Sequence, residues 1–130
     1  MNRLIALLAG TLVLAPAPSL SQSEWVDIKD PSELRALYSN KTFKGTDYLD
    51  RPFVGHYRDD GHGTLLFQGD TYPRTWAVSG NDQVCVTWAM GTMCYQFQKH
   101  KNEPGRYRNW QAGNDRMINN FRVEDGIPKF

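Results

Sequence analysis

The sequence predicts an all-β protein, an antiparallel up-and-down meander that forms a small barrel or a strongly curled sheet, with a short N-terminal helix. Three observations support this prediction. Short segments with alternating apolar and polar residues follow one another from Thr42 onward. Clusters of Gly, Asn or Asp separate them roughly every 8–12 residues, and one stretch near the N-terminus has the signals of a single helix. Closing such a meander removes its exposed edges, which favours a barrel.

The chain opens with a segment typical of a secretory signal peptide. Arg3 supplies one positive charge, an apolar run covers residues 4–15, and a stretch of small residues and prolines ends at Ser21. The run is too short to span a bilayer, and no stop-transfer pattern follows it. We expect cleavage after Ser21, with Ala17 as the alternative.

This assignment predicts the domain organisation and the location. Residues 1–21 are a signal peptide, and residues 22–130 are a single β-rich domain in the periplasm of a bacterium or secreted from it. No cysteine follows the apolar run, which argues against a lipoprotein, and no stable membrane insertion is expected after the signal is removed. The chain has 15 basic and 14 acidic residues. Cleavage removes only Arg3 from this balance, and a neutral mature chain does not favour nucleic acid as a partner.

The stretch "DPSELRALYSN", residues 30–40, predicts the helix. Asp30 is the expected N-cap and Pro31 the first helical residue, while Glu33 completes a pattern that resembles a capping box. An apolar stripe follows at helical spacing, formed by Leu34, Leu37 and Tyr38. A helix this short is marginal alone, so we expect it to dock against an apolar surface.

The remaining segments predict eight strands. They lie at residues 41–45, 53–58, 64–68, 74–78, 83–88, 93–99, 106–111 and 117–123. The turn "DDGHG" joins the second and third, and we expect Gly61 and Gly63 to supply positive φ there.

The only two cysteines, Cys85 and Cys94, predict a disulfide. A structural zinc site needs four ligands, and the spacing is not that of a Cys-x-x-Cys redox pair. A hairpin that turns between Ala89 and Met90 places the two cysteines directly opposite each other, within bonding range. The bond should stabilise the fold near the low end of about 2–4 kcal/mol, because the loop it closes is short.

The same register sorts the neighbouring side chains by polarity. The core face carries Val84, Val86, Met93 and Tyr95, and the sulfurs share the other face with Gln83, Thr87, Thr92 and Gln96. We expect a four-residue loop from Trp88 to Gly91, with positive φ at Gly91.

No motif in the sequence predicts catalysis, a metal or a cofactor. There is no Gly-x-Ser-x-Gly elbow, no His-Glu-x-x-His and no phosphate-binding glycine loop. His56 and His62 with Asp59 or Asp60 match no known ligand spacing, and a solvated hairpin turn explains them more simply. We therefore predict that the protein is not an enzyme.

The aromatic residues are the more suggestive group. Core packing explains most of them, since small barrels fill with such side chains and hold at most one small ligand. The segment "RYRNWQAGNDR" differs from the other aromatic positions because it mixes cations with aromatics. It indicates a candidate binding patch formed by Arg106, Tyr107, Arg108 and Trp110, with Arg116 close in sequence. A solvated edge strand protected by its charges explains this segment more simply.

Several motifs together resemble a known group of proteins. The leader, "ELRALYSNKTFKG", "YRDDGHGT" and the series "TWAV", "QVCVTW", "MCYQF" are similar to small secreted proteobacterial proteins of a domain-of-unknown-function family. The resemblance covers most of residues 33–111. It implies an exported β-fold with a disulfide and no established activity, so no catalytic residue carries over. Arg74 stands where that family has a glycine before the Thr-Trp pair.

We expect a non-catalytic binding module for a cell-envelope partner or a small ligand. The alternatives are an inhibitor or interaction protein that acts on an exogenous hydrolase, and an enzyme. A cavity lined by Trp76, Trp88 and Phe97 would favour the small ligand. A solid core with one exposed loop would favour the inhibitor, and clustered acids or histidines in a cleft would favour the enzyme.

Overall fold

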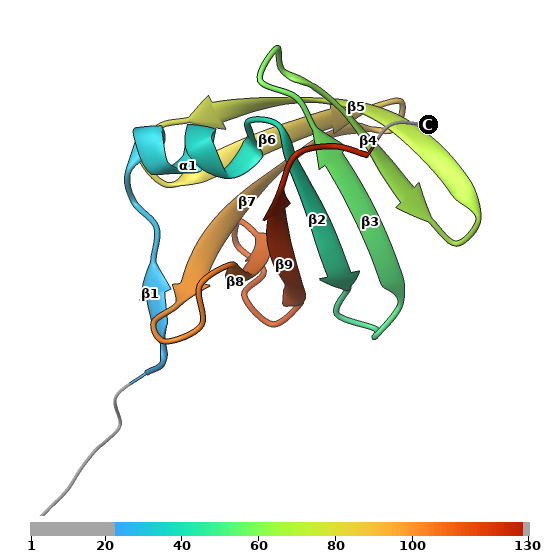
Figure 1. Cartoon of the computed structure of the whole chain (residues 1–130). Coiled ribbons are helices and arrows are strands. Elements are labelled where there is room, and N and C mark those ends of the chain that lie inside the picture. Colours follow the sequence, from blue (N-terminus) through green and yellow to red (C-terminus); the bar gives the residue numbers. More distant parts are fainter. Residues whose placement is uncertain (1–22, 129–130) are drawn as a thin grey trace, which may run out of the picture.

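The computed structural model describes residues 23–128, so the predicted signal peptide lies outside the described residues. They form nine strands and one helix (Figure 1). In chain order these are β1 (Trp25–Asp27), α1 (Pro31–Tyr38), β2 (Lys41–Thr46), β3 (Pro52–Tyr57), β4 (His62–Phe67), β5 (Asp70–Ser79), β6 (Gln83–Trp88), β7 (Gly91–His100), β8 (Arg106–Gln111) and β9 (Asn119–Asp125).

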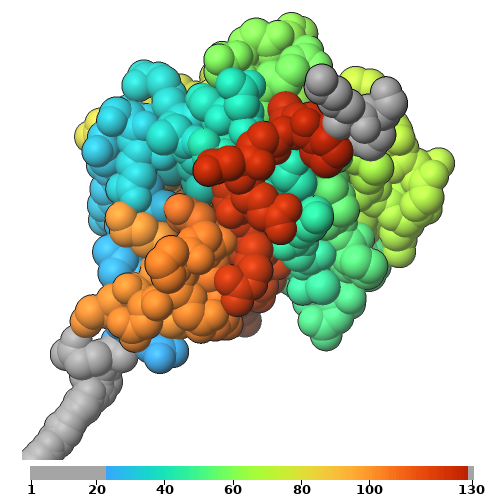
Figure 2. All heavy atoms as spheres, viewed as in Figure 1, coloured from blue at the N-terminus to red at the C-terminus, as the bar shows by residue number. Residues whose placement is uncertain are grey.

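Strands β2 to β9 form a closed up-and-down barrel. Each strand pairs antiparallel with the next, and β9 returns to pair with β2. Figure 2 shows the red β9 segment filling the seam between the orange β8 region and the green-blue β2 region. The predicted all-β barrel with a short helix is confirmed.

The ninth strand, β1, was not predicted. It pairs with the C-terminal end of β7, where Trp25 lies opposite His100 and Asp27 opposite Gln98. Three residues are too few to show a period-two pattern in sequence, so nothing distinguishes such a strand from a linker.

The helix begins and packs as its sequence predicts. The side chain of Asp30 accepts a hydrogen bond from the Ser32 amide at 3.0 Å, and Pro31 is the first residue. The capping role of Glu33 is not observed; its carboxylate accepts a hydrogen bond from Lys99 Nζ at 2.6 Å and so ties α1 to β7. The apolar stripe is buried: Leu34 is fully buried, and Leu37 and Tyr38 nearly so.

The core is built on aromatic rings around Tyr38. The Tyr38 ring lies 4.8 Å from that of Phe43, 4.7 Å from Tyr57 and 5.8 Å from Phe97. Phe121 of β9 stacks on Phe43 across the seam at 4.8 Å. The helix therefore docks on the inward side chains of both halves of the barrel, as a marginal helix requires.

The predicted hairpin register is confirmed. Cys85 lies opposite Cys94 and forms the disulfide, with Val84 opposite Tyr95 and Val86 opposite Met93. Val84 and Val86 are buried. On the outer face the hydroxyls of Thr87 and Thr92 lie 2.8 Å apart.

The predicted length of this loop is wrong. Trp88 pairs with Gly91, so only Ala89 and Met90 remain in the turn. Gly91 has the expected positive φ, at 128°. Pairing continues to the last residue because a two-residue connection follows the twist of the flanking strands.

One predicted glycine role is also wrong. Gly61 has positive φ at 89°, as expected, but Gly63 lies inside β4 opposite Tyr57. A Cβ on Gly63 would lie 2.5 Å from the Tyr57 ring, and one on Gly55 would lie 2.7 Å from it. Both glycines therefore make room for this ring against the inner wall.

Candidate functional site

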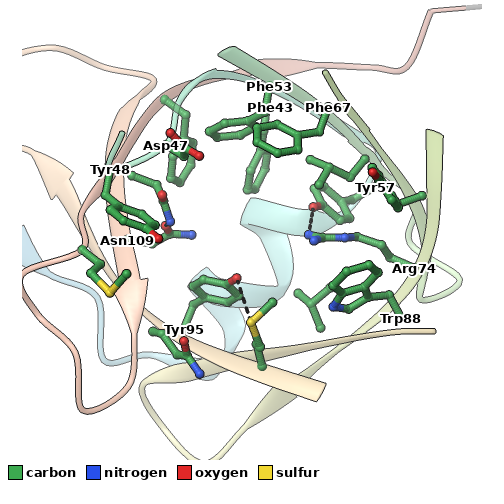
Figure 3. A pocket seen from close by; sticks show the side chains of 18 of the residues that line it. Phe43, Asp47, Tyr48, Phe53, Tyr57, Phe67, Arg74, Trp88, Tyr95 and Asn109 are labelled. Atoms are coloured by element: carbon green, nitrogen blue, oxygen red, sulfur yellow. Dashed lines mark hydrogen bonds between the residues drawn. The ribbon is translucent and has the colours of Figure 1, made fainter. Parts of the chain in front are cut away.

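A cavity of about 420 Å³ occupies the barrel interior between the aromatic core and the loops that follow β2, β4, β6 and β8 (Figure 3). This volume falls in the range of roughly 300–1,000 Å³ that is usual for small-molecule sites. The lining residues come from α1, from all eight strands of the barrel and from two of these loops. They are Tyr38, Phe43, Asp47, Tyr48, Arg51, Phe53, Tyr57, Leu65, Phe67, Tyr72, Arg74, Val86, Trp88, Met93, Tyr95, Asn109, Gln111, Met117, Asn119 and Phe121.

Most of the wall is apolar, and strand alternation puts it there. Phe53 and Phe67 are register partners on β3 and β4, and Leu65 lies two residues before Phe67 on the same face. On the adjacent strands, Tyr72 of β5, the register partner of Leu65, meets Trp88 of β6 edge to face, with ring centres 5.6 Å apart. Such a surface suits an apolar or aromatic guest.

Arg74 brings a positive charge into this apolar space. It lies on β5, and Figure 3 shows its side chain reaching from the wall into the cavity between Tyr57 and Trp88. Its Nη1 donates a hydrogen bond to the Tyr57 hydroxyl at 3.3 Å. Its Nε is buried and has no hydrogen-bond partner among the residues that the structure describes. No ion pair formed within residues 23–128 includes Arg74.

The phenols near Arg74 do not neutralise it. Burial raises the pKa of Tyr38 well above its ordinary value, and the neighbouring Tyr57 and Tyr95 raise it further. Burial likewise raises the pKa of Tyr95, against the opposing effect of Arg74. These hydroxyls therefore stay neutral at physiological pH and leave the guanidinium charge uncompensated.

A second arginine at the cavity, Arg51, is fully paired. Its guanidinium lies 2.8 Å from the Asp47 carboxylate and 5.1 Å from the centre of the Phe67 ring. Desolvation acts to raise the pKa of Asp47, but hydrogen bonds from Arg51 and from the Leu49 amide outweigh it and hold the pKa below its usual value. This pair fixes the loop between β2 and β3 beside the cavity.

Side-chain amides line the wall formed by β8 and β9. Asn109 is buried and its Oδ1 accepts a hydrogen bond from Asn119 at 2.9 Å. Gln111 and Asn119 also face the cavity. The site is thus apolar with a few polar groups, which is the usual composition of a ligand pocket.

Of the three residues considered as a cavity lining from the sequence, one lines the cavity and two do not. Trp88 lines the cavity, whereas Trp76 and Phe97 lie beside Tyr38 in the core and do not line it. Arg74 was not predicted to face the cavity. The signal was available, because Arg74 alternates with Trp76 and Val78 in a strand that was itself predicted.

The predicted binding patch is split by the same alternation. Tyr107 points inward and stacks on Phe121 at 6.2 Å. Arg106 and Arg108 lie on the outer face with their guanidinium groups 5.3 and 4.4 Å from the centre of the Trp25 ring.

The outer members of this patch bond to residues of the same wall. Trp110 donates to the side chain of Gln96 at 3.2 Å, and Arg108 Nε donates to that of Gln98 at 2.7 Å. Arg106 pairs with Glu103 at 2.7 Å. These contacts hold β1, β7 and β8 together, and the four predicted residues do not form one exposed surface.

His56 and His100 are buried and hydrogen-bonded within the fold. His56 is buried beside Thr42, and His100 Nδ1 accepts hydrogen bonds from the amides of Asn102 and Glu103, both at 3.1 Å. No group of three or more His, Cys, Asp or Glu that could hold a metal occurs within residues 23–128.

Comparison of the chain with family models, with curated proteins and with solved structures gave no match. Over the range that the structure covers, there is no helix with the length and apolar character needed to cross a membrane. The site must therefore be interpreted from its own geometry.

Proposed function

We propose that the protein is a non-catalytic binding module that takes up one small, largely apolar ligand inside its barrel. The cavity of about 420 Å³ carries this proposal. An eight-stranded barrel is just wide enough for its own side chains to fill it or for one small ligand to enter. This chain leaves the space open although it is rich in large aromatic residues.

Two glycines of the barrel wall, Gly55 and Gly63, help to shape the cavity. Gly55 and Gly63 let the Tyr57 ring lie against the inner surface, where any Cβ would push it away. The helix supports it from below, since Tyr38 closes the core beneath the cavity. A pocket defined by packed secondary structure is preformed, which reduces the entropic cost of binding.

The choice among the predicted functions follows from the same geometry. A solid core with one exposed loop would have favoured an inhibitor of a hydrolase, and the interior of this barrel is not solid. The polar groups at the cavity are an arginine, phenol hydroxyls, amides and one ion pair. This set binds and orients a ligand but supplies no activated nucleophile.

The location we propose is the periplasm or the extracellular space. The disulfide between Cys85 and Cys94 is typical of oxidising compartments. The N-terminal segment, with its apolar run at residues 4–15, has the pattern of an export signal. Together these features support a role in the cell envelope.

Binding inside the barrel can be tested with a pair of adjacent substitutions. Leu65 lines the cavity, whereas Leu66 is its neighbour on the outer face of β4. We expect Leu65→Trp to fill the cavity and to abolish uptake of apolar probes, measured by quenching of tryptophan fluorescence and by native mass spectrometry. Leu66→Trp should bind as the unmodified protein does.

The two variants also define the result that would contradict the proposal. Equal uptake by Leu65→Trp and Leu66→Trp would show that the probes bind elsewhere, and no uptake by the unmodified protein would exclude the cavity as a ligand site. Ligands that co-purify with the protein from the cell envelope should be lost in Leu65→Trp. Far-UV circular dichroism of both variants checks that the barrel is intact.

A further inference from the structure

We propose that the ligand carries one anionic group, a carboxylate or an equivalent oxyanion, which binds Arg74 inside the barrel while its apolar body fills the aromatic part of the cavity. This inference rests on the proposed ligand-binding function and specifies the chemistry of the ligand. Arg74 carries the argument because its charge has no partner among the residues that the structure describes.

A guanidinium in an apolar interior is unfavourable unless an acid and hydrogen-bond acceptors surround it. Among the described residues, the Arg74 side chain donates to the Tyr57 hydroxyl at 3.3 Å, and its buried Nε has no hydrogen-bond partner. The planar fork of an arginine offers parallel donors that match the oxygens of a carboxylate or of a sulfate. An anionic ligand would satisfy both the charge and the free donor.

The other cavity arginine, Arg51, is neutralised by an acid of the same chain. Arg51 has the Asp47 carboxylate at 2.8 Å, with further hydrogen bonds that hold the pair in place. The chain thus neutralises one cavity arginine with its own acid and leaves the other open to the cavity. The difference indicates that a bound ligand supplies the acid for Arg74, since none of the residues that the structure describes does so.

The position of Arg74 predicts the orientation of the ligand. Trp76 lies deeper on β5 and contacts Tyr38, while Tyr72 lies on the other side of Arg74 and contacts Trp88. On the inward face of β5, Arg74 therefore lies between Tyr72 and Trp76. The apolar rings at the loop end of the cavity lie on the Tyr72 side of Arg74. We expect the anionic group to enter first and the apolar body to remain among Phe53, Phe67, Tyr72 and Trp88.

The test uses three probes that share one alkyl chain, namely decanoate, decanol and decylamine, below their micelle concentrations. Binding is measured by isothermal titration calorimetry and by tryptophan fluorescence. Decanoate should bind the unmodified protein at least about tenfold more tightly than decanol, because a charge-assisted pair forms only with the anion. Decylamine should bind more weakly than decanol, because its charge repels Arg74.

Substitution of the arginine should remove this preference. Arg74→Met keeps the length of the side chain without the charge, so decanoate should lose its advantage and decanol should bind at least as well as before. Arg74→Lys should keep part of the preference, because it keeps the charge and loses the fork. Arg108→Met, on the outer face, is the matched control and should retain the full preference.

A second readout does not depend on any ligand. Arg74→Met removes an unpaired charge from the interior, so it should raise the urea midpoint of the ligand-free protein, whereas decanoate should raise the midpoint of the unmodified protein and not that of the variant. A lower midpoint for ligand-free Arg74→Met would contradict the account of Arg74 as an uncompensated charge.

The outcomes separate this inference from the proposed function. Tight binding of decanol and decanoate without discrimination would overturn the anionic class and leave a ligand-binding barrel. Stabilisation by sodium sulfate with no preference for decanoate would mean that an inorganic anion alone occupies Arg74, and this too would overturn the inference. No binding of any probe to the unmodified protein would overturn both proposals.

Discussion

His56 is a buried histidine on the outer face of β3, and its surroundings favour the neutral ring. The Thr42 hydroxyl donates to the Gly126 carbonyl at 2.8 Å and lies 3.1 Å from His56 Nδ1. A hydroxyl has one hydrogen, so towards the ring Thr42 acts as the acceptor and Nδ1 carries the proton. Burial lowers the pKa of His56 from its ordinary value, and the nearby Lys44 lowers it further.

The lowered pKa predicts a loss of stability in mild acid. The unfolded chain takes up a proton on His56 near pH 6.5, while the folded protein resists protonation until lower pH. Within that window the unfolded state binds more protons, so the free energy of unfolding falls as pH falls. We expect the urea midpoint to drop between about pH 7 and pH 5, and to drop less in His56→Gln.

A matched substitution controls for the number of histidines. His62 is exposed at the start of β4, so His62→Gln should leave the pH dependence of the urea midpoint as it is in the unmodified protein. If His56→Gln and the unmodified protein lost stability equally over this range, the buried neutral histidine would not be the cause.

Single residues also mark where sequence reasoning was limited. Alternation places Arg74, Trp76 and Val78 on one face, but it does not say that Arg74 faces open space while Trp76 faces packed rings. That difference depends on how the strands close and on where α1 docks. Tyr107 shows the converse case, since closeness in sequence grouped it with Arg106 and Arg108 although alternation sends its ring inward.

At the scale of elements, the Trp25 side chain is the main ring contact between β1 and the barrel. Trp25 lies edge to face with His100 at 5.0 Å, with Arg108 on its ring at 4.4 Å. Hydrogen bonds from Ile28 to the Phe97 carbonyl and from Lys101 to the Glu24 carbonyl flank the strand. The backbone pairing of three residues is too weak to keep a strand docked. We therefore expect the Trp25 contacts to decide whether β1 stays on the barrel.

We therefore predict that Trp25→Ala releases β1 without disturbing the barrel. The amide of Lys101 should exchange hydrogen much faster, measured by hydrogen–deuterium exchange, while β2 to β6 keep their protection. Val26→Ala is the control, because Val26 is the next residue and its side chain is exposed. Faster exchange throughout the barrel in Trp25→Ala would mean that β1 belongs to the cooperative core.

The disulfide strengthens an element that already has its register. Polar and apolar side chains sort correctly between β6 and β7 without the sulfurs, and the bond lies on the outer face. Replacing both Cys85 and Cys94 with Ala should lower the free energy of unfolding by about 2–3 kcal/mol, because the closed loop is short. Uptake of apolar probes should persist, since Val86, Met93 and Trp88 line the cavity from the other face.

The measurement compares urea unfolding of the oxidised protein, the reduced protein and the double variant. Reduction should reproduce the loss seen in the variant, and thiol labelling of the unfolded, unreduced protein should find no free cysteine. Two reactive thiols in protein from an oxidising compartment would contradict the disulfide.

At the scale of the whole molecule, the sequence favours a closed barrel but does not indicate the register at which the first and last barrel strands pair. Strand count and spacing favoured a closed meander, and each predicted strand corresponds to an observed one. The size of the interior depends on the number of strands and on the register at which the sheet closes. The closing register is set by pairs far apart in the chain, such as Gly45 with Phe121. Local patterns carry no information about such distances, which is why the cavity was only one of several alternatives.

Gly45 gives the most direct test of that closure. A Cβ on Gly45 would collide with the backbone of Asn120 and Phe121, so no side chain fits unless the two strands separate. Phe121 also stacks on Phe43 and meets Phe97, so separation at the seam would disturb the core that supports the cavity.

We expect Gly45→Ala to lower the free energy of unfolding by about 3 kcal/mol, the upper end for overpacking, because the obstruction is rigid backbone. It should also weaken uptake of apolar probes. Lys44→Ala changes the adjacent exposed residue, whose ion pair with Glu124 at 3.4 Å lies at the surface, and it should cost less than about 1 kcal/mol. Urea denaturation and probe titration of both variants make the comparison. A Gly45→Ala protein as stable as Lys44→Ala, with binding unchanged, would mean that β2 and β9 do not close the barrel at this distance.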